Sequence, residues 1–189
     1  PGLGAITLPL AATGVPLRAI EVDRDLAAAL RERVPAHVSI VCADFLALEA
    51  AEIFGSDPGP VRVVGNLPYN LSSPILFRLL ELARATGRVT DATLMLQREV
   101  ADRVVARPGT GDYGPLAILL GLHATRTRIL SLPPGAFRPP PEVHSAVVRL
   151  AFHPPHSPPG SVATLERLVR VAFQQRRKTI GNALKALAT

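Results

Sequence analysis

Short apolar runs that resemble strands alternate with segments of helical periodicity along most of this 189-residue chain. The expected strands are Leu17–Val22, Val38–Cys42, Val61–Val64, Ala92–Leu96, Arg126–Leu132 and Ser145–Phe152. The expected helices begin near Asp25, residue 46, Ser72, Glu99, Pro115, Val162 and Thr179. Asp25 is the expected N-cap of the first of these helices, and Ser72 or Ser73 that of the third. Such alternation predicts an α/β fold with a parallel, doubly wound sheet, and the last two strands could form an antiparallel pair at its edge.

Composition excludes several other classes of protein. Hydrophobic residues make up 48% of the chain and charged residues 19%, which supports a packed core rather than disorder. Cys42 is the only cysteine, so an intrachain disulfide or a cysteine-based zinc site cannot form. The histidines show no metal-ligand spacing, and no metal is expected. With no long apolar run and no signal peptide in the sequence, we expect a cytoplasmic protein and no membrane partner.

Positive charge is concentrated at the C-terminal end. Residues 161–189 carry +5 of the net +6, and Arg176, Arg177 and Lys178 are consecutive. A nearly neutral body with a basic end is typical of a protein with a polyanionic partner at that end, and charge alone is equally consistent with a solvated helix face.

The opening turn and the first strand carry a pattern typical of nucleotide-cofactor sites. Gly2 and Gly4 form a Gly-x-Gly turn, and Glu21 follows Gly4 by 17 residues at the end of the next strand. A carboxylate at about this spacing accepts hydrogen bonds from both ribose hydroxyls. Asp44 ends the following strand, where it could accept from an adenine amino group, with Phe45 beside the ring. The alternative is a turn with capping acids.

The stretch Gly65-Asn66-Leu67-Pro68-Tyr69-Asn70, directly after an apolar strand, is the most specific signal. The exocyclic amine of adenine is a poor nucleophile because its lone pair is delocalised into the ring. The Asn66 side-chain oxygen and the Leu67 carbonyl could accept its two N–H groups and favour a pyramidal nitrogen. Pro68 restricts the backbone, and Tyr69 offers a face for a stacked base. These residue types therefore suit methyl transfer to that amine by positioning and charge stabilisation.

Taken together, the motifs resemble those of the rRNA adenine N6-dimethyltransferases, a family with small-subunit and large-subunit (Erm) branches. The resemblance rests on Pro1–Gly4, Glu21–Asp23, Asn66–Asn70, Gln97–Arg103, Tyr113–Gly114, Phe137–Ser145 and Arg176–Thr179. It implies a Rossmann-like S-adenosylmethionine-dependent methyltransferase sheet with a small C-terminal helical domain. On this resemblance, residues 1–153 form the methyltransferase domain and 161–189 part of an RNA-binding domain.

The resemblance also implies roles for individual residues. Gly2, Gly4, Glu21, Val22, Asp44, Phe45 and Asn66 would line the S-adenosylmethionine site. The residues Asn66, Leu67, Pro68 and Tyr69 would hold the target adenine, and Phe137 would stack on its other face. The basic residues Arg176, Arg177 and Lys178 would contact rRNA phosphates. Phe137 could equally be a core residue.

The family has further segments before Pro1 and after Thr189, including a central strand, so the chain is expected to be truncated at both ends and to bind its cofactor poorly alone.

The expected function is dimethylation of adenine N6 at adjacent adenosines in 16S rRNA of the small-subunit precursor during ribosome biogenesis, by a monomer. The alternatives are an Erm-type enzyme acting on 23S rRNA and giving antibiotic resistance, or a catalytically inactive nucleic-acid-binding relative. A dehydrogenase would explain the glycines and Glu21 but not Asn66–Tyr69 or Phe137.

Overall fold

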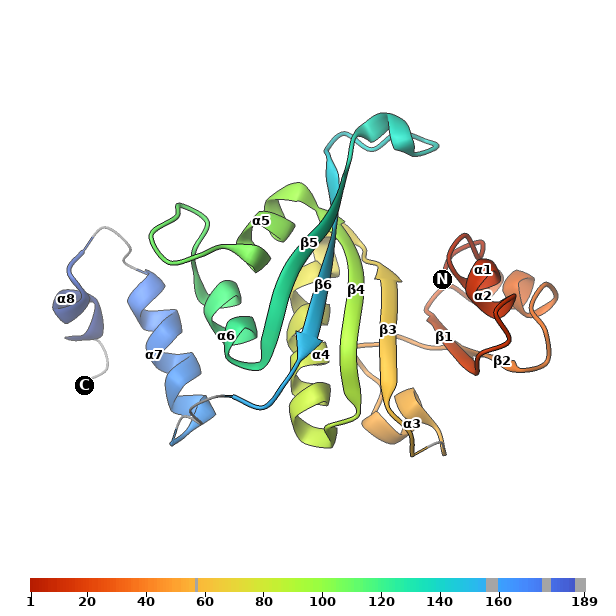
Figure 1. The fold of residues 1–189 in the computed structure, drawn as a ribbon, viewed down its shortest axis with the longest axis horizontal. Helices are drawn as coiled ribbons and strands as arrows, with labels where there is room; N and C mark the ends of the chain where they lie inside the picture. Colours follow the sequence, from red (N-terminus) through yellow and green to blue (C-terminus); the bar gives the residue numbers. More distant parts are fainter. Residues whose placement is uncertain (57, 156–159, 175–177, 186–189) are drawn as a thin grey trace. The chain divides into compact units, whose positions relative to one another are not determined.

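The computed structural model describes residues 1–189 except 57, 156–159, 175–177 and 186–189 (Figure 1). The chain divides into two compact units, Pro1–Leu94 and Met95–Thr189, which are described separately. Within the described residues, no helix combines the length and the apolar character that a membrane crossing requires.

The first unit begins with two strands that alternate with two helices. These elements are α1 (Thr7–Ala11), β1 (Leu17–Glu21), α2 (Arg24–Arg31) and β2 (Val38–Cys42). The strands pair in parallel, with Leu17 opposite Val38 and Glu21 opposite Cys42. Helix α2 starts at Asp23, whose side chain accepts the N–H groups of Asp25 and Leu26. Parallel pairing therefore brings the carboxyl ends of β1 and β2 to one edge.

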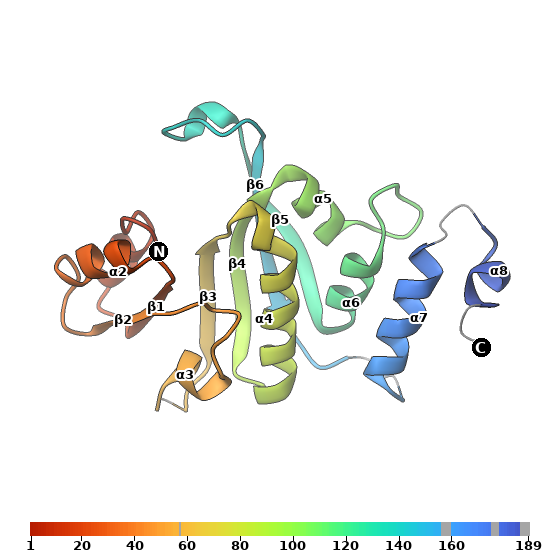
Figure 2. The same ribbon diagram turned by 180° about the vertical axis from the view of Figure 1, so that it is seen from behind.

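The rest of the first unit supplies a second pair of strands and a long helix. Its elements are α3 (Ala50–Phe54), β3 (Val61–Asn66), the 3-10 turn η1 (Tyr69–Leu71), α4 (Ser72–Thr86) and β4 (Val89–Gln97), whose last three residues belong to the second unit. Strands β3 and β4 are neighbours in their sheet. Helix α4 runs along one face of these strands (Figure 2) and buries a leucine-rich side. Gly87 ends the helix with a φ of 64°, a left-handed conformation that glycine adopts without strain.

The second unit combines helices with an antiparallel pair of strands. Its elements are α5 (Arg98–Val105), α6 (Pro115–His123), β5 (Ala124–Leu132), the 3-10 turn η2 (Pro134–Ala136), β6 (Ser145–Phe152), α7 (Val162–Gln174) and α8 (Ile180–Leu184). Strand β5 pairs with β6 from Ala124 opposite Phe152 to Leu132 opposite Ser145. The loop between the two strands extends well beyond them in Figure 1.

Most of the expected elements are present, and the antiparallel orientation of the last two strands is confirmed. The expected caps are wrong in two places. Asp23 rather than Asp25 caps α2. Ser72 lies inside α4, and its N-cap Leu71 makes no side-chain capping bond. Helix α3 begins at Ala50 instead of near residue 46, and strands β4 and β5 are longer than expected.

Candidate active site

Several polar residues of the first unit lie at or just after the carboxyl ends of its strands. Glu21 is the last residue of β1 and Asn66 the last residue of β3. Asp44 follows β2 by two residues. Ala43, between that strand and Asp44, donates its N–H to the Glu21 carbonyl at 3.0 Å. In an open α/β sheet this edge is the usual place for a bound ligand.

The glycine turn is bonded directly to Glu21. The N–H of Gly2 donates to Glu21 Oε2 at 2.8 Å, and the N–H of Asp23 donates to Oε1 at 3.1 Å. Burial alone raises the pKa of Glu21, but the hydrogen bonds from these two N–H groups oppose burial, and the pKa lies below its ordinary value. Glu21 is therefore held as a carboxylate, and each of its oxygens keeps acceptor capacity for a ligand hydroxyl.

Both glycines of the turn have conformations that other residues rarely adopt. Gly2 has a φ of 56°, and a Cβ built there would meet nothing within 4 Å. Gly4 has a φ of 93°, and a Cβ there would lie 2.8 Å from Leu30 Cδ1. Gly4 is thus required by close packing on α2, whereas Gly2 borders open space next to a carboxylate.

The side chains expected beside the cofactor are accessible. Val22 is 67% exposed, Asp44 is exposed, and Phe45 is half-buried. Asp44 Oδ1 accepts the N–H of Leu46 at 2.9 Å, which fixes its side chain at the end of β2. An exposed apolar residue beside an oriented carboxylate fits one face and one edge of an adenine ring.

The loop after β3 combines one buried anchor with two exposed polar groups. Leu67 is 9% exposed, while Asn66 and Tyr69 on either side are exposed. Among the described residues, the Asn66 carboxamide makes no hydrogen bond. A side chain that a loop presents to solvent, next to a buried leucine, is positioned to bind a ligand rather than to hold the fold.

Ser72 tethers this loop to helix α4. Its side chain is completely buried, and its hydroxyl donates to the Pro68 carbonyl at 3.0 Å. The N–H of Leu71 donates to the same carbonyl at 3.0 Å. The sequence predicts Ser72 only as a possible helix cap, so its hydrogen bond to the site loop is a feature that the structure adds. A serine four residues after a loop proline, in an apolar helix, is the signal that could have indicated it.

The remaining predicted site residues belong to the second unit. Phe137 is half-buried and follows η2 in the loop between β5 and β6. Lys178 is exposed and precedes α8. Arg176 and Arg177 lie outside the described residues. In the part of the chain that the structure describes, no three His, Cys, Asp or Glu side chains gather in a way that could hold a metal ion.

The fold and this site define a class of protein. An acid bonded to a glycine turn at the end of one strand, followed along the chain by strands that lead to an exposed acid and an exposed amide, is typical of Rossmann-like enzymes that bind a nucleoside cofactor. The chain belongs to the ribosomal RNA adenine dimethylase family, whose model matches residues 1–189.

Curated relatives are similar over nearly the whole chain. Ribosomal RNA small subunit methyltransferase A of Aromatoleum aromaticum is 47% identical over 187 residues, which cover 98% of this chain and 68% of the relative. The protein of the same name from Chromobacterium violaceum is 47% identical over 190 residues, which cover 100% of this chain and 70% of the relative. The chain thus spans about two thirds of the length of these relatives.

Solved structures support the same fold. The 23S rRNA methyltransferase ErmE superposes with a TM-score of 0.74 at 29% identity, over 98% of this chain and 72% of its own. A dimethyladenosine transferase from Plasmodium falciparum superposes with a TM-score of 0.70 at 23% identity, over 89% of this chain and 58% of its own. The predicted family and the Rossmann-like methyltransferase fold are confirmed, and a dehydrogenase is excluded.

Proposed function

We propose that this chain transfers methyl groups from S-adenosylmethionine to N6 of adenines in small-subunit rRNA. The observation that carries the proposal is the exposed Asn66 carboxamide at the end of β3, which makes no hydrogen bond within the described residues. It stands on a loop that a buried leucine and Ser72 hold in place. A preorganised neutral acceptor is what an amino group needs when it must lose conjugation to react.

The cofactor side of the site suits the adenosine and methionine parts of this molecule. S-adenosylmethionine supplies an electrophilic methyl group on a sulfonium sulfur. Glu21 would accept from its ribose hydroxyls, and Asp44 from its adenine amino group, with Val22 and Phe45 against the ring. Gly2 borders open space, so the methionine part could pass close to the backbone there. Gly4 would support that turn through its packing on Leu30.

The acceptor side would work by positioning. Asn66 Oδ1 and the Leu67 carbonyl would each accept one N6–H, and Tyr69, which is 39% exposed, would stack on the base. The nitrogen lone pair would then attack the methyl carbon while the carbon–sulfur bond breaks. The N6 proton on one of these acceptors would pass to solvent, which restores a neutral amine that can be methylated again. Pro68 limits motion of the loop, and Phe137 would cover the other face of the base.

The choice of RNA depends on the relatives. Small-subunit enzymes share 44 to 47% identity with this chain, whereas ErmE shares 29%. This difference favours the small-subunit precursor, during ribosome biogenesis in the cytoplasm. Residues 1–153 would form the catalytic domain, and 161–189 would contact rRNA phosphates through Arg176, Arg177 and Lys178. Large-subunit methylation is the second candidate, because ErmE superposes over 98% of the chain.

Transfer of labelled methyl groups to unmethylated small and large ribosomal particles tests both candidates. We expect labelling of the small particle and two methyl groups per adenine. Asn66→Ala should lower kcat by roughly 100-fold or more, because it removes a preorganised acceptor, while much of the RNA affinity persists. Asn70→Ala, an exposed asparagine of the same loop with no proposed contact, serves as the control. Labelling of the large particle alone would reject the proposed substrate, and full turnover by Asn66→Ala would reject the proposed mechanism.

A further inference from the structure

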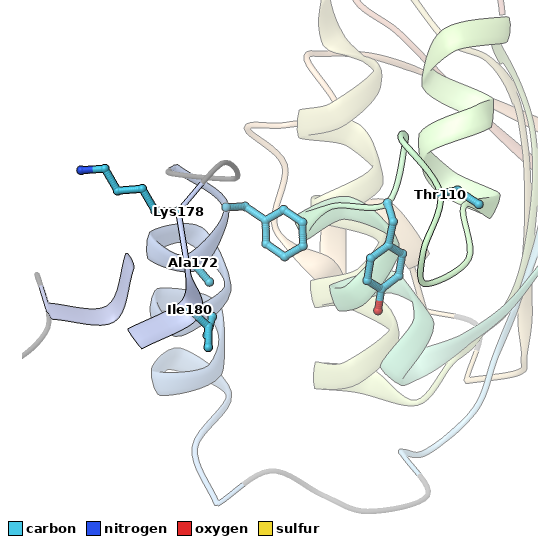
Figure 3. Close-up of a pocket in the computed structure, with 6 residues that line it drawn as sticks. Thr110, Ala172, Lys178 and Ile180 are labelled. Carbon is cyan, nitrogen blue, oxygen red and sulfur yellow. The ribbon is translucent and has the colours of Figure 1, made fainter. Parts of the chain in front are cut away.

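A cavity of about 300 Å³ lies in the second unit, and none of its lining residues is among those proposed for the cofactor site (Figure 3). Its walls come from the loop between α5 and α6, from the end of α7 and from the start of α8. The lining residues are Thr110, Tyr113, Ala172, Phe173, Lys178 and Ile180. The volume lies at the lower end of the range for small-ligand sites, which suits a single flat group better than a large ligand.

Two aromatic rings form one side of this cavity. Tyr113 and Phe173 meet edge to face, with ring centroids 6.3 Å apart and planes at 67°. Such a pair leaves ring faces that the partner ring does not cover, so a further flat group can stack there. Both side chains are only half-buried, and Ile180 beside them is 63% exposed. The surface is therefore apolar and aromatic yet open to solvent, unlike a core.

Positive charge lies at the rim rather than inside. Lys178 is one of the lining residues, and its ammonium end points away from Thr110 and Ala172 in Figure 3. Residues 161–189 carry a net charge of +5. A cavity that accepts a flat group, with a positive charge at its rim, suits one unpaired nucleotide. The base would stack on the rings and the phosphate would lie near Lys178.

Hydrogen bonds from Arg126 fix both ends of the loop that carries Tyr113. Arg126 Nη1 donates to the carbonyls of Val104 at 3.0 Å and of Ala117 at 2.6 Å, which bracket the α5–α6 loop. Within the loop, the N–H of Thr110 bonds to the Arg107 carbonyl and that of Tyr113 to the Thr110 carbonyl, each at 3.2 Å. A wall fixed in this way reduces the entropy lost on binding, as expected for a preformed site.

We infer that this cavity binds one unpaired nucleotide of the RNA, with its base stacked on Phe173 and Tyr113 and its phosphate at Lys178. This inference rests on the proposed function only because it takes RNA as the ligand. The cavity shares no residue with the contacts proposed for the methylated adenine, and it would favour RNA that offers an unpaired nucleotide.

The chain contains no tryptophan, so a single introduced tryptophan reports on the cavity alone. In the full chain, Phe173→Trp is titrated with a mixed-sequence single-stranded RNA and with the same RNA annealed to its complement. We expect base stacking to quench the fluorescence on the single strand and not on the duplex. Leu168→Trp is the matched control, because it lies five residues earlier on α7 and does not line the cavity. Absence of quenching at saturating single strand, or equal quenching of both variants, overturns the inference.

Affinity measurements use separate variants. Phe173→Leu keeps an apolar side chain but removes the ring, and it should weaken single-strand binding roughly tenfold. Lys178→Gln should lower the slope of log affinity against log salt by about 1. Lys185→Gln also removes one positive charge from residues 161–189, so it measures how much of this change comes from charge alone. If Phe173→Leu binds naked RNA normally but loses affinity for small-subunit particles, the occupant is a protein and the inference is wrong. Methyl transfer by the wild type is measured independently, so either proposal can fail without the other.

Discussion

The carboxylate of Glu21 at the end of β1 accepts the backbone N–H of Gly2 at 2.8 Å, across 19 residues of sequence. This bond fixes the glycine turn against the strand whose acid is proposed to bind the cofactor ribose. The same side chain thus supports the local fold and faces the ligand, so its replacement should affect stability and binding together.

Glu21→Gln is expected to weaken S-adenosylmethionine binding at least tenfold. The amide has one acceptor oxygen in place of two and no charge, so it cannot accept from both ribose hydroxyls. The free energy of unfolding should fall by about 1–2 kcal/mol, because the N–H groups of Gly2 and Asp23 lose a charged acceptor. Isothermal calorimetry and urea unfolding measure the two effects. Glu32→Gln, at an exposed acid after α2, should change neither.

The contribution of Glu21 should also depend on pH in one direction. Its pKa in the folded chain lies below the ordinary value of 4.5. The carboxylate therefore stabilises the fold fully above that value, and this contribution is lost as the pH falls through the lower folded pKa. The stability difference between wild type and Glu21→Gln should be constant from neutral pH down to about pH 5 and should shrink below 4.5. A difference that grows in acid would contradict the assignment.

Gly4→Ala should destabilise the fold by about 2–3 kcal/mol, as judged by urea unfolding. The residue has a φ of 93°, and the new methyl would lie 2.8 Å from the buried Leu30 side chain. Gly14→Ala is a matched control, because that glycine has a φ of 77° but nothing within 4 Å of the new atom. It should cost only about 1 kcal/mol of backbone strain. Equal effects would show that packing on Leu30 contributes nothing.

Ser72→Ala should reduce turnover roughly fivefold to tenfold without changing the KM for the cofactor. Loss of the hydroxyl frees the Pro68 carbonyl of one of its two bonds, so the loop carrying Asn66 and Tyr69 becomes less ordered. Stability should fall by about 1 kcal/mol. Ser73→Ala, at the exposed neighbour, should match the wild type in both respects. A fall in stability with unchanged kcat would make Ser72 a purely structural residue.

Tyr69 is expected to act through its ring and not through its hydroxyl. Tyr69→Phe should keep most methyl transfer, because the face on which a base stacks remains. Tyr69→Leu should raise the KM for RNA roughly tenfold and leave cofactor affinity unchanged. Steady-state kinetics with unmethylated small-subunit particles distinguishes the variants, and a large loss in Tyr69→Phe would indicate a role for the phenol instead.

Strands and the order of elements followed from local pattern. Strands β2 and β6 have the bounds that their apolar runs predicted, and β5 and β6 pair in the expected antiparallel sense. The helix starts were less predictable, because Asp23 and Asp25 are both suitable caps. The choice depends on the backbone of Asp23, which is extended with ψ 121° and whose N–H is taken by Glu21.

The chemistry of the site could also be predicted from the sequence, to the extent that residue types and their spacing indicate it. A glycine turn, an acid 17 residues later and an Asn-Leu-Pro-Tyr stretch after an apolar strand indicate cofactor and adenine contacts without any coordinates. These signals are local, since each depends on a turn or on the end of one strand. They determined the class of protein and the residues to examine.

Tertiary structure alone decided the contacts between residues that are distant in sequence. It brought the N–H of Gly2 to the Glu21 carboxylate, and it placed Leu30 against Gly4. It also paired Tyr113 with Phe173, which no periodicity relates. The physical reason is that periodicity encodes which face of an element is apolar, whereas the neighbour that covers that face is selected only when the elements pack.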